Sequence, residues 1–406
     1  MKIFATCIIF FLLLCPGLSV AANEDSIPVF AAQASIDVAG AVNAEVAAAV
    51  ATARAELDVL ADAMRYLAHL PYVQLAGAND GSAAFLPPLL DGLVWEIFSF
   101  SPKKSETLHQ DSGQKAITGG VSATFAGADL HAAVTDAIGK QVILERYSAS
   151  LHLQEETLQR IEPLLPLLRR AGHVPGARQA REQLRNEVNN LWALSLYRTL
   201  LPDYTGLWPY PARQRATLTD ALEKAPDNPL LLGAMAELAL QENRVEEAQQ
   251  YIGRSLQQEG RFAFLHDVHG LVYLRQQLPL LASQAFGAAI AQTPRDPQYR
   301  LHRASALLLM GELEAMCADF REACVLGDCS GLQWARGQGY CQPLAGGQEA
   351  VDATATASGT TLATEHHAEQ KPDAAILQKK SSVYPGAFRD LASPRKNWSG
   401  NEGPTP

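Results

Sequence analysis

Four cysteines near the C-terminal end of the expected helices are the residues whose type and spacing point most directly to chemistry: Cys317, Cys324, Cys329 and Cys341. The other two of the six cysteines, Cys7 and Cys15, lie within residues 1–22, which have the composition of a cleaved secretory signal. An even number of remaining cysteines in an exported protein favours disulfides, and four cysteines can pair in three ways. Cys317 and Cys324 lie seven residues apart on one expected helix, a separation of about 10.5 Å by the helical rise. Because bridged Cα atoms lie within about 7 Å of each other, these two cannot pair unless the helix unwinds.

A nested pairing of the four cysteines satisfies this geometry. If the chain turns after Cys324 and residues 332–338 form a returning helix, Cys329 comes back beside Cys324 and Cys341 reaches Cys317. The disulfides Cys324–Cys329 and Cys317–Cys341 are therefore the set that fits this geometry, and the sequence leaves the connectivity open. The larger loop should contribute about 3 to 4 kcal/mol in the chain-entropy model, and its disulfide would pin the last helix over the open end of the helices before it.

Short catalytic and cofactor motifs are absent from the sequence. It contains no His-Glu-x-x-His, Gly-x-Ser-x-Gly, Walker A, Gly-x-Gly-x-x-Gly or Cys-x-x-Cys pattern, each of which marks a known kind of active or cofactor site. We therefore expect a non-enzymatic protein with no catalytic residue, no cofactor and no metal. Two alternatives stay open. The four thiols could bind zinc, although they lack the paired knuckle spacing, and glycosidase carboxylates, which would act on cell-wall material, carry no short motif.

The cysteines follow three copies of one helical-hairpin pattern. The copies begin 34 residues apart, at Pro229, Ala263 and Pro297, and this period is typical of the tetratricopeptide repeat (TPR), a helix-turn-helix unit. Residues 214–330 therefore resemble a TPR array. The middle copy matches the TPR pattern at six positions: Gly270, Tyr273, Ala282, Phe286, Ala289 and Pro294. A degenerate earlier repeat is indicated by Leu218, Ala221 and Pro226.

The resemblance to TPR arrays implies a concave groove, lined by the first helix of each repeat, that binds a protein or peptide. The groove positions lack the lysine and asparagine cluster with which some TPR domains clamp a carboxylate terminus. By register with the repeat, the predicted partner-binding residues are Glu237, Leu240, Gln241, Phe264, Asp267, Leu271, Arg275, Leu301, Ser305 and Leu309.

Residues 1–22 have the composition of a secretory signal peptide. An apolar run from Ile8 to Leu14 is followed by small residues suited to cleavage before Asn23. We therefore expect a periplasmic or secreted protein. A lipoprotein anchor at Cys15 fits less well, because Leu14 stands where a small residue is expected. No other stretch approaches the roughly 18 uninterrupted apolar residues of a membrane span, so no integral membrane span is expected.

Composition limits the classes of partner. The chain has 406 residues, of which 48% are hydrophobic, enough for two or three domains with apolar cores. Its formal net charge is −10 and its pI is near 5.5. Proteins that bind nucleic acids or anionic membranes need a basic face, so we expect no nucleic-acid partner.

Residues 23–127 predict a small α+β domain. Alternation over residues 35–43 indicates a strand, and the apolar spacing from Val46 to Leu67 then becomes that of an amphipathic helix. The competing interpretation is one long helix over residues 31–70. Residues 93–100 are dense in β-formers, and even spacing of apolar residues over 117–125 completes a predicted hairpin.

This order of elements resembles a domain of other bacterial proteins. The strand, the helix with Ala53-Arg54 and Ala61-Asp62-Ala63, and the two further strands are similar to the βαββ domain at the N-terminus of some flagellar-assembly and outer-membrane proteins. The resemblance implies a fold and no function.

The remaining segments are assigned from helical spacing and composition. Residues 128–201 predict a helical linker broken at Gly139, near Pro163 and before Gly176, with its two long helices packed antiparallel. Residues 202–341 hold the solenoid and its disulfide-capped last helix. Residues 342–406 are rich in small and polar residues, which predicts a disordered tail.

The sequence thus predicts a mainly α fold: a TPR helical-hairpin solenoid with a small N-terminal α+β (βαββ) domain and a disordered C-terminal tail. The predicted function is that of an exported TPR adaptor that binds a protein or peptide in the bacterial cell envelope through its groove. The alternative is a structural component of envelope assembly that oligomerises through the βαββ domain. The oligomeric state is left open.

Overall fold

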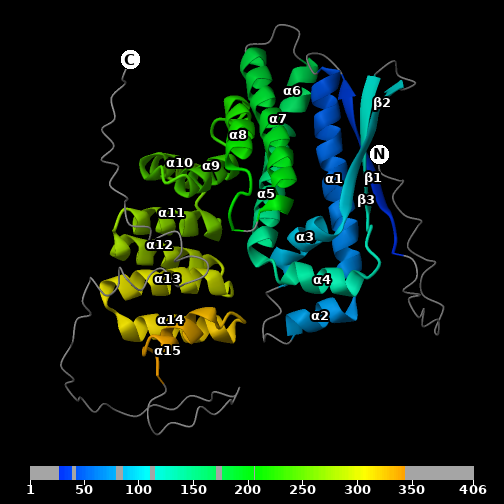
Figure 1. The fold of residues 1–406 in the computed structure, drawn as a ribbon. Coiled ribbons are helices and arrows are strands. Elements are labelled where there is room, and N and C mark those ends of the chain that lie inside the picture. Colours follow the sequence, from blue (N-terminus) through cyan, green and yellow to red (C-terminus); the bar gives the residue numbers. More distant parts are fainter. Residues whose placement is uncertain are drawn as a thin grey trace, which may run out of the picture.

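The computed structural model describes residues 27–38, 43–78, 86–109, 115–170, 176–204 and 206–342. The predicted signal peptide lies outside these ranges, as does the predicted disordered tail apart from Gln342. The described chain is mostly helical. Figure 1 shows an N-terminal part, in which a small sheet lies against helices, beside a stack of helical hairpins, with α5 and α7 between them.

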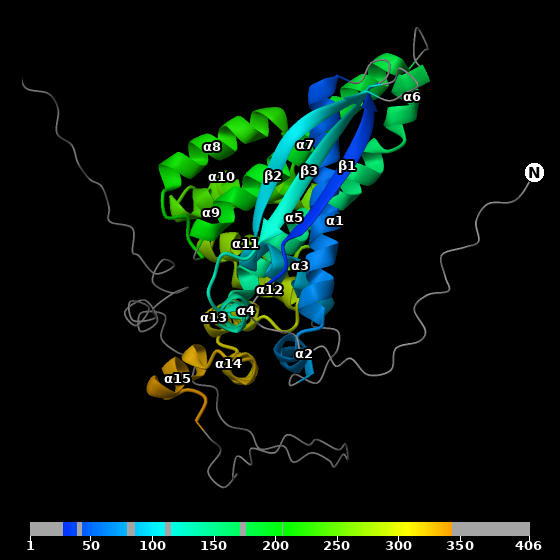
Figure 2. The ribbon, with the colours of Figure 1, turned by 90° about the vertical axis from the view of Figure 1, so that its right-hand side faces the viewer.

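A three-stranded antiparallel sheet begins the described chain. β1 (Phe30–Val38), β2 (Ser99–His109) and β3 (Lys115–Thr124) pair in the order β1-β3-β2. The long helix α1 (Ala44–Ala68) lies across one face of this sheet (Figure 2) and is followed by the short α2 (Pro71–Ala78). α1 begins where the Asn43 side chain accepts a hydrogen bond of 2.8 Å from the backbone N–H of Val46, which satisfies one of the first free amides of the helix.

Two predictions for the first elements need correction. The first strand covers residues 30–38 instead of 35–43, because the alternation of exposed and more buried side chains already starts at Phe30 and Asn43 already caps α1. The competing single helix over residues 31–70 is wrong for the same reason.

The strand predicted over residues 93–100 is also wrong, because most of it belongs to the helix α3 (Leu86–Ile97). Leu90, Leu93 and Val94 are buried at the spacing of one helical face. Gly92 lets the backbone of α3 touch the next layer, since a Cβ there would lie 2.3 Å from the carbonyl oxygen of Leu144. Packing against the rest of the fold therefore overrides the β propensity of these residues. The hairpin lies further along the chain, formed by β2 and β3, and only its second strand matches the prediction for residues 117–125.

Four helices connect the sheet to the solenoid. They are α4 (Leu130–Ile138), α5 (Gln141–Ile161), α6 (Leu164–Arg170) and α7 (Ala177–Leu200). α5 and α7 pack antiparallel as predicted, since Arg198 donates to Ser150 Oγ at 3.0 Å near one end and Arg160 pairs with Glu187 at 3.0 Å near the other.

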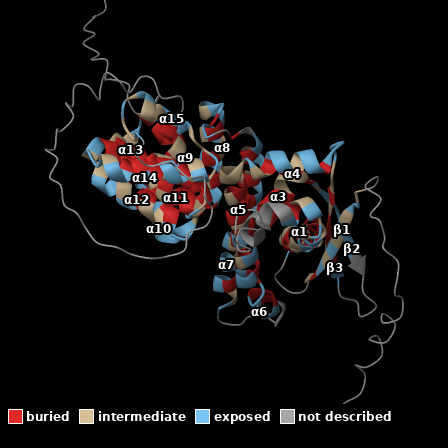
Figure 3. Ribbon diagram, turned by 90° about the horizontal axis from the view of Figure 1, so that it is seen from below, coloured by how far each residue is buried: buried red, intermediate tan, exposed pale blue. Residues whose placement is uncertain are grey.

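α5 is a shared central helix. It contributes buried side chains to three apolar clusters: one with α1, α3 and β3, one with α6 and α7, and one with the first helices of the solenoid. Figure 3 shows its buried residues between the two parts of the molecule. The segment predicted as a linker therefore forms the core that joins both parts.

The solenoid repeats every 34 residues, as predicted. After the 3-10 turn η1 (Leu201–Asp203), its helices are α8 (Pro211–Lys224), α9 (Pro229–Gln241), α10 (Val245–Gln258), α11 (Ala263–Arg275), α12 (Pro279–Gln292), α13 (Pro297–Met310), α14 (Leu313–Val325) and α15 (Ser330–Gly337). Close packing within the second hairpin needs a glycine, because a Cβ on Gly270 would lie 2.4 Å from the ring of Phe286. The predicted fold class, a mainly helical hairpin solenoid with a small N-terminal sheet, is confirmed.

Two disulfides close the C-terminal end of the solenoid. They join Cys317 to Cys341 and Cys324 to Cys329, which is the nested pairing that fits the helix geometry. α15 covers the last hairpin closely, since a Cβ on Gly331 would lie 2.4 Å from the ring of Phe320. The disulfides therefore hold a capping helix over the last hairpin that the structure describes.

No helix in the described ranges is both long enough and apolar enough to cross a membrane.

Candidate functional site on the inner face of the solenoid

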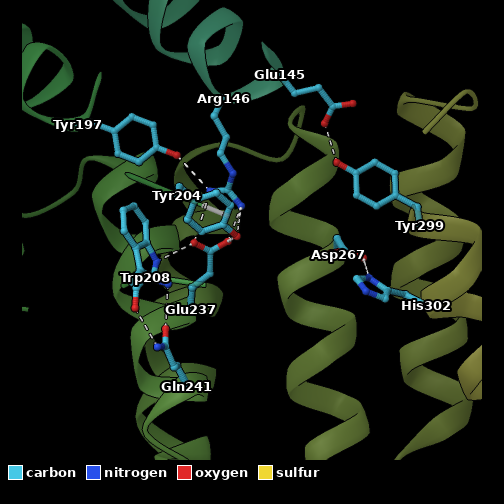
Figure 4. Close-up of polar contacts among 10 residues, drawn as sticks. All are labelled: Glu145, Arg146, Tyr197, Tyr204, Trp208, Glu237, Gln241, Asp267, Tyr299 and His302. Atoms are coloured by element: carbon cyan, nitrogen blue, oxygen red, sulfur yellow. Dashed lines mark hydrogen bonds and ion pairs between the residues drawn. The ribbon is translucent and has the colours of Figure 1, made fainter. Parts of the chain in front are cut away.

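The inner face of the solenoid is the side formed by the first helices of the three hairpins, α9, α11 and α13. The chain itself covers this face at α9 and at the starts of α11 and α13. Figure 4 shows Glu145 and Arg146, near the start of α5, directed toward the solenoid helices, with Tyr204 and Trp208 from the segment before α8 beside them. Several predicted groove residues make their contacts here.

Arg146 is the centre of this contact. Its side chain is buried and forms an ion pair with Glu237 of α9. It also donates hydrogen bonds of 3.2 Å to the hydroxyl oxygens of Tyr197 and Tyr204. The guanidinium lies 4.4 Å from the ring centre of Tyr204 and 4.6 Å from that of Phe264, close enough for cation–π attraction. Burial alone would lower the pKa of Arg146, but the charge of Glu237 raises it, so the guanidinium stays charged.

Glu237 and Gln241 are also held by the segment before α8. The Trp208 indole N–H donates to Glu237 Oε2 at 3.2 Å. The Gln241 amide exchanges two hydrogen bonds with the Trp208 backbone, at 3.0 and 2.9 Å. Because Trp208 is almost fully buried, this segment is a fixed part of the inner face.

A second contact joins α5 to α13. The hydroxyl of Tyr299 donates to Glu145 Oε2 at 2.5 Å. Burial and the nearby charge of Asp296 raise the pKa of Glu145 to about 8. Burial also raises the pKa of Asp296 to about 6, although that carboxylate accepts a hydrogen bond of 2.7 Å from the backbone N–H of Gln298. Glu145 is therefore protonated at neutral pH.

This contact predicts a pH dependence of stability. Burial and the charge of Asp296 raise the pKa of Glu145 from its ordinary value of 4.5 in the unfolded chain to about 8 in the folded one, so the folded state binds the proton more tightly. Its contribution to stability is complete below pH 4.5 and is lost as the pH rises toward 8, by up to about 1.4 kcal/mol per pH unit. Glu145→Gln should remove this loss. The free energy of unfolding of the variant, measured with urea, should therefore rise relative to that of the wild type between pH 5.5 and 8.5.

The control for this prediction is Glu182→Gln, at an exposed position of α7, which should follow the wild-type pH dependence. Unfolding curves of Glu145→Gln and the wild type that keep a constant separation from pH 5.5 to 8.5 would contradict the prediction.

Asp267 and His302 form a buried pair between α11 and α13. The carboxylate Oδ1 of Asp267 lies 2.7 Å from His302 Nδ1, and both side chains are largely buried. Burial lowers the pKa of His302, but Asp267 raises it and the net shift is upward. Asp267 therefore binds a neighbouring helix of its own solenoid.

The other predicted groove residues differ in exposure. Leu240 is buried, and Ser305 is buried with its hydroxyl donating to the Leu301 carbonyl at 2.9 Å. Three are half-buried, namely Leu271, Arg275 and Leu301, and Arg275 donates to Asn243 Oδ1 at 3.3 Å. Leu309, with 42% of its surface exposed, is the most accessible. The predicted groove is thus closed at its first hairpin and more open toward the third.

Sequence reasoning missed the residues of α5 that meet the solenoid. One feature of the sequence does indicate a buried contact on α9, because Glu237 is the only charged residue in this apolar helix. A charge on an apolar helix needs a partner, and Arg146 follows the apolar run from Val142 to Leu144. Nothing in the sequence pairs these two, since 91 residues separate them.

The described residues contain no group of three or more His, Cys, Asp or Glu side chains arranged to hold a metal ion. No protein-family model matches the chain, and the searches of curated proteins and of solved structures found no match. Any functional inference therefore rests on the contacts within the chain.

Proposed function

We propose that this chain is an exported, non-enzymatic adaptor of the TPR type that binds a protein or peptide of the bacterial cell envelope. The binding surface is the inner face of the second and third hairpins, which includes Leu271, Arg275, Leu301 and Leu309. One observation carries the proposal: the inner face of the same solenoid already holds a helical segment, α5, through an ion pair, aromatic contacts and apolar packing.

Two further observations support the adaptor function. The helices repeat with the TPR period of 34 residues, and solenoids of this kind use their concave side for binding. The two disulfides suit a protein that works in an oxidising compartment such as the bacterial periplasm.

The test changes the accessible end of the inner face. Leu309→Asp places a charge where a partner would bury an apolar side chain, and Val325→Asp is its control at the end of α14, where the valine is 80% exposed. In cross-linking and affinity capture from envelope extract, Leu309→Asp should reduce recovery of the specific partner about tenfold, equivalent to about 1.4 kcal/mol. Val325→Asp should leave recovery unchanged. Equal recovery with both variants would reject this surface.

A second candidate function is a structural component of envelope assembly that oligomerises through the N-terminal sheet. The observation that favours it is the outer strand β1, whose far edge pairs with no strand among the described residues.

A further inference from the structure

The two edges of the N-terminal sheet differ in how well they resist further pairing. β2, on one edge, contains Pro102, Lys103 and Lys104, and its register shifts between Lys103 and Glu106. Proline, lysine and bulges are the devices by which proteins keep an edge strand from adding another strand. β1, on the other edge, has none of these. All nine of its residues pair with β3 in one unbroken register, and Asp37 is its only charged residue.

The side chains of β1 leave its backbone edge accessible. The residues on the face toward α1 include Ala32, Ala34 and Ile36, which are half-buried or buried, whereas Ala31, Gln33 and Ser35 are exposed on the opposite face. Side chains of this size do not shield backbone N–H and C=O groups. Figures 1 and 2 show the sheet on the side of the molecule away from the solenoid, so a strand could approach β1 without meeting the repeats.

We propose that β1 pairs antiparallel with β1 of a second copy of this chain, about a two-fold axis at Ala34. The two three-stranded sheets would then form one six-stranded sheet with both α1 helices on the same face. This proposal deepens the second candidate function and does not depend on the adaptor function.

The sequence of β1 complements itself in this register. Ala32 of one copy lies opposite Ile36 of the other on the apolar face, and Gln33 lies opposite Ser35 on the exposed face. Asp37 lies opposite Ala31 of the second copy, so no like charges meet, and like charges directly opposite each other would destabilise the pair. Because one strand pair is smaller than the roughly 1,200 Å² of a stable interface, the expected association depends on concentration.

Ala31 provides the test, because it is exposed and its partner within its own sheet is the neutral Ser122. In the pairing about Ala34, a charge at position 31 faces Asp37 of the second copy, and the two-fold axis repeats this contact. Ala31→Lys should therefore tighten the dimer and Ala31→Asp should weaken it, each by roughly three- to tenfold in the dissociation constant. Within one copy the two variants should fold alike, which far-UV circular dichroism checks.

The measurement is sedimentation velocity of the mature full-length chain and both variants over a concentration series. A wild-type dimer whose dissociation constant falls with lysine and rises with aspartate supports the proposal. A wild-type chain that stays monomeric at about 100 μM, far above a typical dissociation constant for a specific complex, overturns it. A dimer that responds equally to both charges, or in the reverse direction, also overturns it. None of these outcomes bears on partner capture by Leu309→Asp.

Discussion

Replacing Arg146 by alanine is expected to lower the free energy of unfolding by about 3 to 5 kcal/mol, because removing one member of a buried ion pair leaves an uncompensated charge in the interior. The charge left behind is that of Glu237, which among the described residues keeps its hydrogen bonds from Tyr204 and Trp208. Urea unfolding of the purified protein, followed by circular dichroism, measures the loss.

Two further variants separate the buried pair from ordinary effects of arginine removal. Arg254→Ala removes a cation that pairs with Asp227 at 3.4 Å on the surface, where both side chains are about half exposed or more, so its cost should stay below about 1 kcal/mol. The double variant Arg146→Met with Glu237→Leu removes both buried charges and should recover most of the loss. If Arg146→Ala unfolds at the same urea concentration as Arg254→Ala, the ion pair does not hold α5 to the solenoid.

The Arg146–Glu237 ion pair links the N-terminal part of the molecule to the solenoid. α5 shares apolar clusters with both the sheet and the solenoid, and Arg146 links it to α9. Because repeat solenoids otherwise interact only with their nearest neighbours, this lateral contact couples the N-terminal part to the repeats. A groove that is closed at one end by its own chain would leave the second and third hairpins as the accessible region for a partner.

The sequence predicts local periodicity well and long-range contacts poorly. The 34-residue period and the close approach at Gly270 depend on neighbouring residues, so both are readable from spacing. The nested disulfides fit helix geometry over a sequence separation of 24 residues, which is again a local property. The sequence predicts a strand where α3 forms, because the contact that favours the helix is made with α5, about 50 residues further along the chain, where Gly92 meets Leu144.

The groove residues also show that long-range contacts are hard to predict from local spacing. Their register on the first helices is a local property, and it follows from the repeat. Their occupation by Arg146 and Trp208 depends on segments outside the repeats, which no repeat pattern describes. Positions predicted to meet a partner, such as Glu237 and Gln241, therefore meet the chain itself.

Removing the Cys317–Cys341 disulfide by substituting both residues with alanine is expected to cost about 3.5 kcal/mol in the chain-entropy model, because it closes a loop with a sequence separation of 24 residues. Alanine is a better replacement than serine in this experiment. Cys317 is 7% exposed, and a serine hydroxyl there would be buried without a hydrogen-bond partner. The corresponding change at Cys324 and Cys329 opens a loop with a separation of five residues and should cost less, about 2 kcal/mol.

Hydrogen exchange can show which helices lose stability when the Cys317–Cys341 disulfide is removed. End repeats of a solenoid can open without the rest, so loss of the larger disulfide should raise hydrogen exchange in α14 and α15 before it affects α9 or α11. The Cys324/Cys329 variant serves as the control, because its short loop leaves α15 tied to α14 through Cys341. Equal losses in the two double variants, or exchange that rises uniformly along the solenoid, would contradict a capping role. Free thiols at all four positions, found by mass spectrometry of the purified protein under non-reducing conditions, would exclude the disulfides themselves.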